Sequence, residues 1–188
     1  MPFIVIDGLD ASGKDTQAVR LFNHLNAAGN RICLRFHPST DNFFGVKAKL
    51  FLYSKGKSAH FASALFYMLD VIRSIILFTR RGYNYVIFVR YLMGTAYLPS
   101  PLHKVAYHFF ALVVPKSDAM FFLDISPEEA YRRIRTRSDQ ERFEELPELR
   151  KVRCKALSLA LIGKWIILDA GKPVDALEKD IRECIGST

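Results

Sequence analysis

The sequence predicts an α/β protein in which helices cover both faces of a parallel five-stranded sheet. Five short apolar runs alternate with longer segments of helical periodicity along the 188 residues. Continuous apolar runs are typical of strands buried on both faces, and strands that alternate with helices form parallel sheets. A glycine-rich turn between the first run and the first helical segment favours the same architecture. The length suits one domain, which we expect to span residues 1–188.

The expected strands are rich in β-branched and aromatic residues and are bounded by polar or turn-forming residues. In a parallel sheet of this kind, ligands bind beyond the carboxyl ends of the strands. The loops that follow the first three strands are therefore the most informative parts of the chain. The strands are expected at residues 3–7, 32–36, 85–89, 120–124 and 165–168.

The expected helices lie between these runs and show apolar residues at helical spacing. The clearest start is at Ser126, because this serine can cap the helix, Pro127 suits the first helical position and Glu129 completes a capping box. The helices are expected at residues 14–28, 44–53, 59–79, 102–114, 127–137, 147–162 and 174–184.

Composition and charge narrow the class of protein. Hydrophobic residues make up 50% of the chain and charged residues 24%, which is an ordinary globular balance. The net charge of +8 would suit either nucleic acid or a polyphosphate ligand. Because the chain has no run of more than two consecutive Lys or Arg, and no RNA-binding signature with interleaved aromatic residues, we favour phosphate ligands and expect no nucleic-acid partner.

Three further features suit a cytoplasmic protein. The apolar segment 61–79 approaches membrane-spanning length, but it contains Asp70 and Arg73, so we interpret it as a long core helix and expect no membrane partner. A strand begins at the N-terminus, so we expect no signal peptide. The cysteines are widely spaced and form no CxxC pair, so they predict neither a zinc site nor a disulfide framework; they are Cys33, Cys154 and Cys184.

The strongest motif is the glycine-rich turn at residues 8–16, which reads GLDASGKDT. Gly8 and Gly13 let backbone N–H groups approach a phosphate, and the N-terminus of the following helix favours an anion. Lys14 adds an ammonium that can reach the outer phosphates. The motif therefore predicts a phosphate-binding P-loop and a nucleotide ligand, with an incidental glycine-rich turn as the alternative. A magnesium-ligating hydroxyl usually follows the lysine, whereas this chain has Asp15 there and a hydroxyl one place later at Thr16.

A second motif is the arginine-rich stretch after Ala130. Guanidinium groups suit phosphate oxygens and stabilise a phosphoryl group during transfer. The alternative is a solvated helix face, with arginines paired to nearby glutamates such as Glu129. Beside a P-loop, the sequence leaves both interpretations open. The arginines are Arg132, Arg133, Arg135, Arg137 and Arg142.

Five ordered segments carry a resemblance that spans nearly the whole chain. They read DGLDASGKDTQ at 7–17, LRF at 34–36, IFVRY at 87–91 with AY at 96–97, LDISPE at 123–128 with RIR at 133–135 and ERFE at 141–144, and WIILDA at 165–170. Together they resemble the thymidylate kinase family. The resemblance implies a three-layer P-loop NTPase fold with a short lid, which falls at about residues 137–147. It also implies ATP and Mg²⁺ as co-substrates and a nucleoside monophosphate as acceptor.

The resemblance also assigns residues to the nucleotide and to catalysis. Lys14, Arg90, Arg137 and Arg142 would be catalytic, with the last two acting from the lid. The P-loop itself has no arginine, which makes the lid arginines more important. Metal binding would fall to Asp15 and Thr16. The residues that would bind ATP are Gly8, Ala11, Ser12, Gly13, Lys14, Asp15, Thr16 and Arg133.

The acceptor site follows from the same resemblance. Asp10 would meet the 3′-hydroxyl of the acceptor sugar, with a turn-forming aspartate as the alternative. Phe66 would stack on the base, although core packing would also explain it. The full set of expected acceptor residues is Asp10, Phe36, His37, Phe66, Asp70, Arg73, Arg90, Thr95 and Tyr97.

Four positions depart from the family pattern. Val89 stands where an aspartate usually precedes Arg90, and Asp15 stands where a hydroxyl is expected, so we hypothesise that Asp15 supplies the metal carboxylate that position 89 lacks. The loop after the second strand has no arginine for the acceptor phosphate, although His37 partly substitutes. Asp70 replaces an arginine; it either faces a base other than thymine or pairs with Arg73 on the helix.

The sequence therefore predicts phosphoryl transfer from ATP to a pyrimidine deoxynucleoside monophosphate, with dTMP as the leading acceptor. Two alternatives stay open: a catalytically degenerate paralogue that binds nucleotide and regulates, and a kinase for another nucleotide or small acceptor. The resemblance also implies a homodimer, for which the apolar helix at residues 59–79 offers a face.

Overall fold

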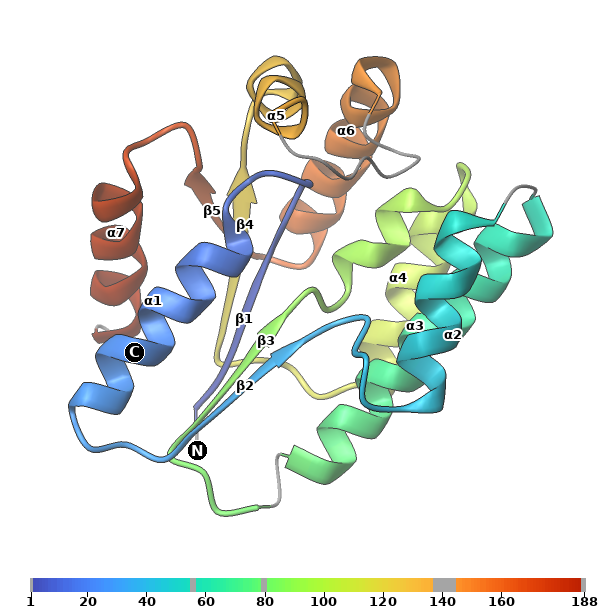
Figure 1. Ribbon diagram of the computed structural model, residues 1–188. Coiled ribbons are helices and arrows are strands. Elements are labelled where there is room, and N and C mark those ends of the chain that lie inside the picture. The colour runs from blue at the N-terminus through green and yellow to red at the C-terminus, as the bar shows by residue number, and fades with distance from the viewer. Residues whose placement is uncertain (1, 55–56, 79–80, 137–144, 187–188) are drawn as a thin grey trace.

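The computed structural model describes residues 2–54, 57–78, 81–136 and 145–186. They form a parallel sheet of five strands, in the order β2-β3-β1-β4-β5, between two layers of helices (Figure 1). This confirms the predicted α/β fold. The strands are β1 Phe3–Gly8, β2 Ile32–Phe36, β3 Tyr85–Val89, β4 Ala119–Asp124 and β5 Ile166–Asp169.

The helices divide between the two faces of the sheet. Helices α1 and α7 pack together over one face, whereas α3, α4 and α6 lie on the other, and α2 packs along α3 (Figure 1). Seven α-helices and one 3₁₀ helix, η1, lie within the described ranges. Their bounds are α1 Lys14–Ala27, α2 Phe43–Tyr53, α3 Lys57–Phe78, η1 Met93–Tyr97, α4 Leu102–Val113, α5 Pro127–Ile134, α6 Leu146–Ile162 and α7 Val174–Gly186.

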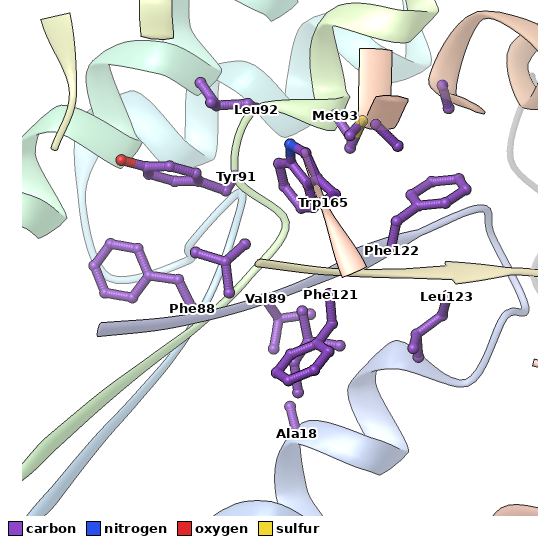
Figure 2. Close-up of a cluster of buried hydrophobic side chains, with 14 of the residues drawn as sticks. Ala18, Phe88, Val89, Tyr91, Leu92, Met93, Phe121, Phe122, Leu123 and Trp165 are labelled. Atoms are coloured by element: carbon purple, nitrogen blue, oxygen red, sulfur yellow. The ribbon is translucent and has the colours of Figure 1, made fainter. Parts of the chain in front are cut away.

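The central strands carry the core. In β4, Phe121 and Leu123 point toward Ala18 of α1, whereas Phe122 points the opposite way and lies near Trp165 (Figure 2). All three β4 side chains are fully buried. The alternation follows from the pleat of the strand, and both faces are apolar because helices cover both.

Two predictions about the elements are corrected. We expected every strand to be covered on both faces, but no residue of β5 is fully buried, and Ile166 and Ile167 are 36% and 38% exposed. The helix expected at residues 127–137 ends at Ile134, where the Thr136 hydroxyl donates to the Arg133 carbonyl and satisfies an acceptor that the helix leaves open. The start of this helix is confirmed, because Ser126 Oγ accepts from Glu129 N at 3.2 Å.

Helix α3 is a core helix on one face only. Its segment Phe61–Phe78 is long and apolar enough to cross a membrane, but 28% of that segment is buried. The buried face carries Asp70 and Ser74, which bond to Ser39 after β2 and to Arg35 in β2. The exposed face is apolar, with Leu65 56% exposed.

Candidate functional site

The loop between β1 and α1 forms a cradle of backbone amides. Ala11 and Gly13 adopt left-handed backbone conformations, with φ of 62° and 84°, which turn successive peptide groups inward at the start of α1. A Cβ on Gly8 would lie 2.6 Å from the Leu123 carbonyl oxygen, so only glycine lets the end of β1 pass β4 this closely. The Ser12 hydroxyl is buried and has no partner among the described residues. The cradle therefore suits an anion that would accept hydrogen bonds.

Lys14 is folded back over this cradle. Its Nζ donates to the Leu9 carbonyl at 2.9 Å and lies 3.5 Å from Asp10 Oδ1, and the side chain is almost fully buried. Burial lowers the pKa of the ammonium and the charge of Arg90 lowers it further, while the nearby carboxylates oppose the shift. The lysine is thus held at the loop where a P-loop phosphate would sit.

Arg90 extends from the end of β3 toward the same loop. Its Nη1 lies 3.3 Å from Asp15 Oδ1 and its Nη2 lies 3.7 Å from Asp10 Oδ1. Burial disfavours the guanidinium charge, but the two carboxylates outweigh this effect and raise the Arg90 pKa. One permanently charged arginine therefore bridges the P-loop aspartate and the first turn of α1.

Asp10 is the polar centre of the arrangement. The Tyr97 hydroxyl donates to Asp10 Oδ2 at 2.8 Å. Burial opposes ionisation of Asp10, but Lys14, Arg90 and this hydrogen bond together lower its pKa. Asp10 is therefore an anion that can accept a further hydrogen bond from a hydroxyl group.

A cavity of about 110 Å³ opens beside Asp10 and Arg90. Its polar end lies at the loops after β1 and β3, and its apolar end lies between α2, α3 and η1. A small ligand with a phosphate at one end and a flat ring at the other suits this division. The cavity is lined by Asp7, Gly8, Asp10, Pro38, Phe51, Leu52, Ser63, Ala64, Tyr67, Arg90, Gly94, Tyr97 and Leu98.

Arg133 approaches the cradle from α5. Its Nη1 and Nη2 donate to the carbonyls of Ala11 and Ala170 at 3.4 and 3.3 Å, and its Nε donates to Glu129 Oε1 at 2.7 Å. Glu129 also holds Arg132, so the glutamate-paired helix face that we kept as an alternative is present here. Arg133 fits both interpretations, because it pairs with Glu129 and also contacts the P-loop at the Ala11 carbonyl.

A phosphate cradle, a bridging arginine and an adjoining cavity are the parts that a phosphoryl-transfer enzyme needs. The family model described as thymidylate kinase matches residues 6–181 of the chain. The chain belongs to the thymidylate kinase family. Members of this family are nucleoside-monophosphate kinases of the transferase class.

Individual relatives agree with this assignment. A probable thymidylate kinase from Pyrobaculum calidifontis is 30% identical, with 95% of this chain and 93% of the relative covered. One from Pyrobaculum aerophilum is 31% identical, with 98% and 96% covered. Among solved structures, a thymidylate kinase from Candida albicans matches with a TM-score of 0.75 and 22% identity over 99% of this chain and 91% of that one, which supports the P-loop NTPase fold.

The structure brings together three residues of the expected acceptor set. Asp10, Arg90 and Tyr97 all line the cavity, and Lys14 lies within hydrogen-bonding reach of Asp10. Arg137, Arg142 and most of the expected lid lie outside the described residues.

The expected residues on α3 do not line the cavity. The Phe66 ring stacks on Phe51 with centroids 5.6 Å apart, so it backs a residue that lines the cavity. Asp70 is fully buried and accepts from Ser39 N and Ser39 Oγ, both at 2.6 Å. Its expected contact with the base or with Arg73 is thus replaced by an anchor for the loop after β2, and the guanidinium of Arg35 lies 4.0 Å from it.

Three expected acceptor residues outside α3 also lie away from the cavity wall. Phe36 aligns with Val89 at the end of the sheet and is 36% exposed. Thr95 is buried in η1, with its hydroxyl bonded to the Leu92 carbonyl at 2.7 Å. His37 is buried behind Pro38, and only the proline lines the cavity.

Sequence analysis missed the residues that form the apolar wall. On α3 these are Ser63, Ala64 and Tyr67, which are spaced as neighbours on one helical face. The helical spacing was visible in the sequence, but α3 is apolar on several sides and gave no reason to select this face. The Tyr67 hydroxyl donates to the Tyr91 carbonyl at 3.0 Å, and Gly94 leaves room for its ring, since a Cβ there would lie 2.8 Å from Tyr67 Cε1.

Asp15 and Thr16 offer oxygen ligands that suit a cation bound jointly by the protein and by phosphate groups. The described residues contain no group of three His, Cys, Asp or Glu that could hold a metal ion alone. Asp15 is exposed at the mouth of the cradle, with Thr16 beside it. Mg²⁺ commonly takes one or two carboxylates together with phosphate oxygens and water, so these residues fit it.

Proposed function

We propose that this protein transfers the γ-phosphoryl group of ATP to dTMP. The observation that carries the proposal is the continuity of the site: Arg90 contacts both the first turn of α1, through Asp15, and the P-loop aspartate that lines the cavity, Asp10. A group at this position can contact donor and acceptor phosphates together. Membership of the thymidylate kinase family supports dTMP as the acceptor.

Catalysis rests on alignment and charge neutralisation, since phosphoryl transfer needs no covalent intermediate. The loop amides and Lys14 bind the ATP phosphates, and Arg90 stabilises charge on the group in transfer. Asp10 accepts a hydrogen bond from the sugar 3′-hydroxyl and so orients the acceptor. Phe51 and Tyr67 pack against the base.

Asp15 and Thr16 would hold Mg²⁺ together with the ATP phosphates. The ion, when bound, neutralises charge on the phosphate oxygens. The fully buried Val89 has no carboxylate to offer at the end of β3, and Asp15 supplies one at the first turn of α1 instead.

We also propose that the lid expected at about residues 137–147 would close over ATP within the single domain 1–188 and would supply Arg137 and Arg142. Arg133 already lies between the P-loop and the loop after β5, which is a suitable place to bind the nucleotide from above the cradle. Closure would exclude water that otherwise hydrolyses ATP.

A coupled assay of ADP release tests this function. We expect the highest kcat/KM with dTMP in a panel that also contains dUMP, dCMP, UMP and AMP, and a loss of about 100-fold or more in K14A. ATP binding measured by calorimetry, with no ADP release for any acceptor, would instead support the non-catalytic paralogue. The family match and the relatives give no support to that alternative or to a different acceptor.

We also propose that the protein is a cytoplasmic homodimer. The exposed faces of α3 and α4 form an apolar groove that includes Leu65, Val105 and Phe109, which are 56%, 62% and 60% exposed. Apolar surface of this kind is typical of an interface. Light scattering should give twice 21.5 kDa, and V105E should give the monomer mass.

A further inference from the structure

The peptide group that joins Arg90 to Tyr91 is held at both ends by side chains. Its carbonyl lies 3.1 Å from His37 Nδ1. Its N–H donates to Asp7 Oδ2 at 2.8 Å, and the same oxygen lies 3.3 Å from Met93 N. Asp7 is the penultimate residue of β1 and His37 follows β2, so the carboxyl ends of two strands fix one peptide that follows a third.

This peptide follows a strained residue. Arg90 has a φ of 64°, a left-handed conformation that is unfavourable for an L-residue with a long side chain. Such conformations persist where surrounding contacts over-determine them, and they occur often at functional sites. The Arg90 N–H also donates to the Ile6 carbonyl at 3.1 Å, so the backbone of Arg90 is held on both sides.

The clamp determines where the guanidinium points. Val89 and Tyr91 are fully buried, so neither neighbour can shift without disturbing the core. Rotation of the peptide between Arg90 and Tyr91 would let Arg90 leave its left-handed conformation. That change would swing its side chain away from Asp10 and Asp15, where it bridges the cavity and the P-loop.

His37 is placed to act through Arg90 and not on the acceptor. Its side chain is almost fully buried, and its ring packs edge-on against Phe88 with centroids 4.9 Å apart. Because Nδ1 faces a carbonyl oxygen, Nδ1 carries the proton. Its backbone N–H also donates to the Val89 carbonyl at 3.1 Å. His37 Nδ1 and the His37 backbone N–H thus both hold the end of β3, whereas the buried Nε2 has no partner among the described residues.

We propose that Asp7 and His37 are positioning residues that lock the Arg90–Tyr91 peptide and thereby aim the Arg90 guanidinium at the phosphates in transfer. The inference rests on the proposed function for its kinetic consequence, but the clamp is a property of the free protein. Misplacement of a catalytic group by about 1 Å lowers rates by about 100-fold, so loss of a clamp should affect kcat strongly.

The test compares H37N with H37L. An asparagine amide can donate to the Arg90 carbonyl from a position near that of Nδ1, whereas leucine cannot. We expect kcat with dTMP to fall about 30-fold or more in H37L and to stay within about threefold of wild type in H37N, with the KM for ATP changing less than threefold in both. D7N should resemble H37L, because it weakens the acceptor for Tyr91 N–H.

The control is the pair H103N and H103L. His103 is also a buried histidine, but it lies in α4 and bonds to no part of the P-loop or of residues 89–93. These variants should lower the melting temperature as the His37 variants do and keep kcat. A merely structural role for His37 would make the two pairs of variants behave alike, and this result would overturn the proposal.

Hydrogen exchange provides a readout that does not depend on activity. The Tyr91 amide should exchange at least tenfold faster in H37L than in wild type, with H37N intermediate and H103L unchanged. Equal Tyr91 protection in all four proteins would show that no clamp exists. If the wild-type protein transferred no phosphoryl group to any acceptor, the proposed function would fail while this exchange experiment would still decide for or against the clamp.

Discussion

Arg90 Nη1 lies 3.3 Å from Asp15 Oδ1, and this ion pair joins the end of β3 to the first turn of α1. The Asp15 side chain is 56% exposed, so the pair contributes little to stability. The ion pair matters because it holds a carboxylate and a guanidinium together at the mouth of the phosphate cradle. A cation held by ATP phosphates would compete with Arg90 for this carboxylate.

Replacing Asp15 with serine should therefore change the response to magnesium. We expect D15S to need about tenfold more free Mg²⁺ for its half-maximal rate, because the exposed carboxylate in the first turn of α1 is lost. Adding V89D should restore much of the response by returning a carboxylate to the end of β3. Initial rates against free Mg²⁺, together with Mn²⁺ binding followed by electron paramagnetic resonance, measure the effect.

The matched control is D180S, which removes a partly exposed carboxylate that pairs with Lys172 away from the cradle. It should leave the magnesium response unchanged. An unchanged magnesium response in D15S would remove the support for Asp15 as a metal carboxylate.

Asp70 should matter for stability and not for base selection. It accepts from Ser39 N, Ser39 Oγ and Asn42 Nδ2, at 2.6, 2.6 and 2.7 Å, and it is fully buried. We expect D70A to lose about 3 kcal/mol in the free energy of unfolding, because buried donors are left without an acceptor. Urea denaturation measures this loss.

The ratio of kcat/KM for dTMP to that for dCMP should stay within about twofold of wild type in D70A. A change of tenfold or more in that ratio would return Asp70 to the base-binding role that the sequence suggested.

Much of the fold could be predicted because β1, β3 and β4 are buried on both faces and therefore read as continuous apolar runs. The exposure of β5 could not be predicted from its sequence, since Ile166 and Ile167 look like core residues and yet are exposed. The short helix η1 has no periodicity to detect, and its residues lie in what the sequence shows only as a connection.

The site residues that belong to a short sequence motif could be predicted. The site residues that are brought together only by the tertiary fold were harder to predict. Lys14, Asp10 and Arg90 follow from the P-loop and from the resemblance, and the structure places them together. Which side chains of α3 line the cavity depends on the rotation of the helix about its axis. This rotation places Tyr67, and not Phe66, in the cavity wall. The left-handed conformation of Arg90 is a tertiary property, because no local sequence signal requires it.

Filling the apolar end of the cavity should impair acceptor binding alone. Ala64 lines the cavity from α3, opposite the P-loop, so A64L should raise the KM for dTMP about tenfold or more. Its effect on ATP binding, measured by calorimetry, should be less than twofold. A62L is the control, since Ala62 lines the outer groove between α3 and α4, as Ala64 also does, but not the cavity. Equal effects of A64L on dTMP and ATP binding would argue against this cavity as a separate acceptor site.

The buried His37 should make the protein less stable in mild acid. Burial lowers the pKa of its imidazole to about 4, with Arg35 lowering it further and Asp70 opposing the shift. In the unfolded chain the pKa is about 6.5, so the unfolded state binds the proton first as the pH falls. The contribution of neutral His37 to the free energy of unfolding is therefore fully present above pH 6.5. It is lost progressively as the pH falls toward 4, by up to about 3 kcal/mol.

Urea denaturation at pH 7 and pH 5 checks this expectation. The wild-type protein should lose about 2 kcal/mol more between these pH values than H37N does, because asparagine does not titrate. The comparison with H37N removes the contribution of the carboxylates, which are the same in both proteins. Equal losses in the two proteins would mean that His37 already binds a second proton in the folded state at pH 5. The assignment of His37 as a neutral imidazole that donates to the Arg90 carbonyl would then be wrong.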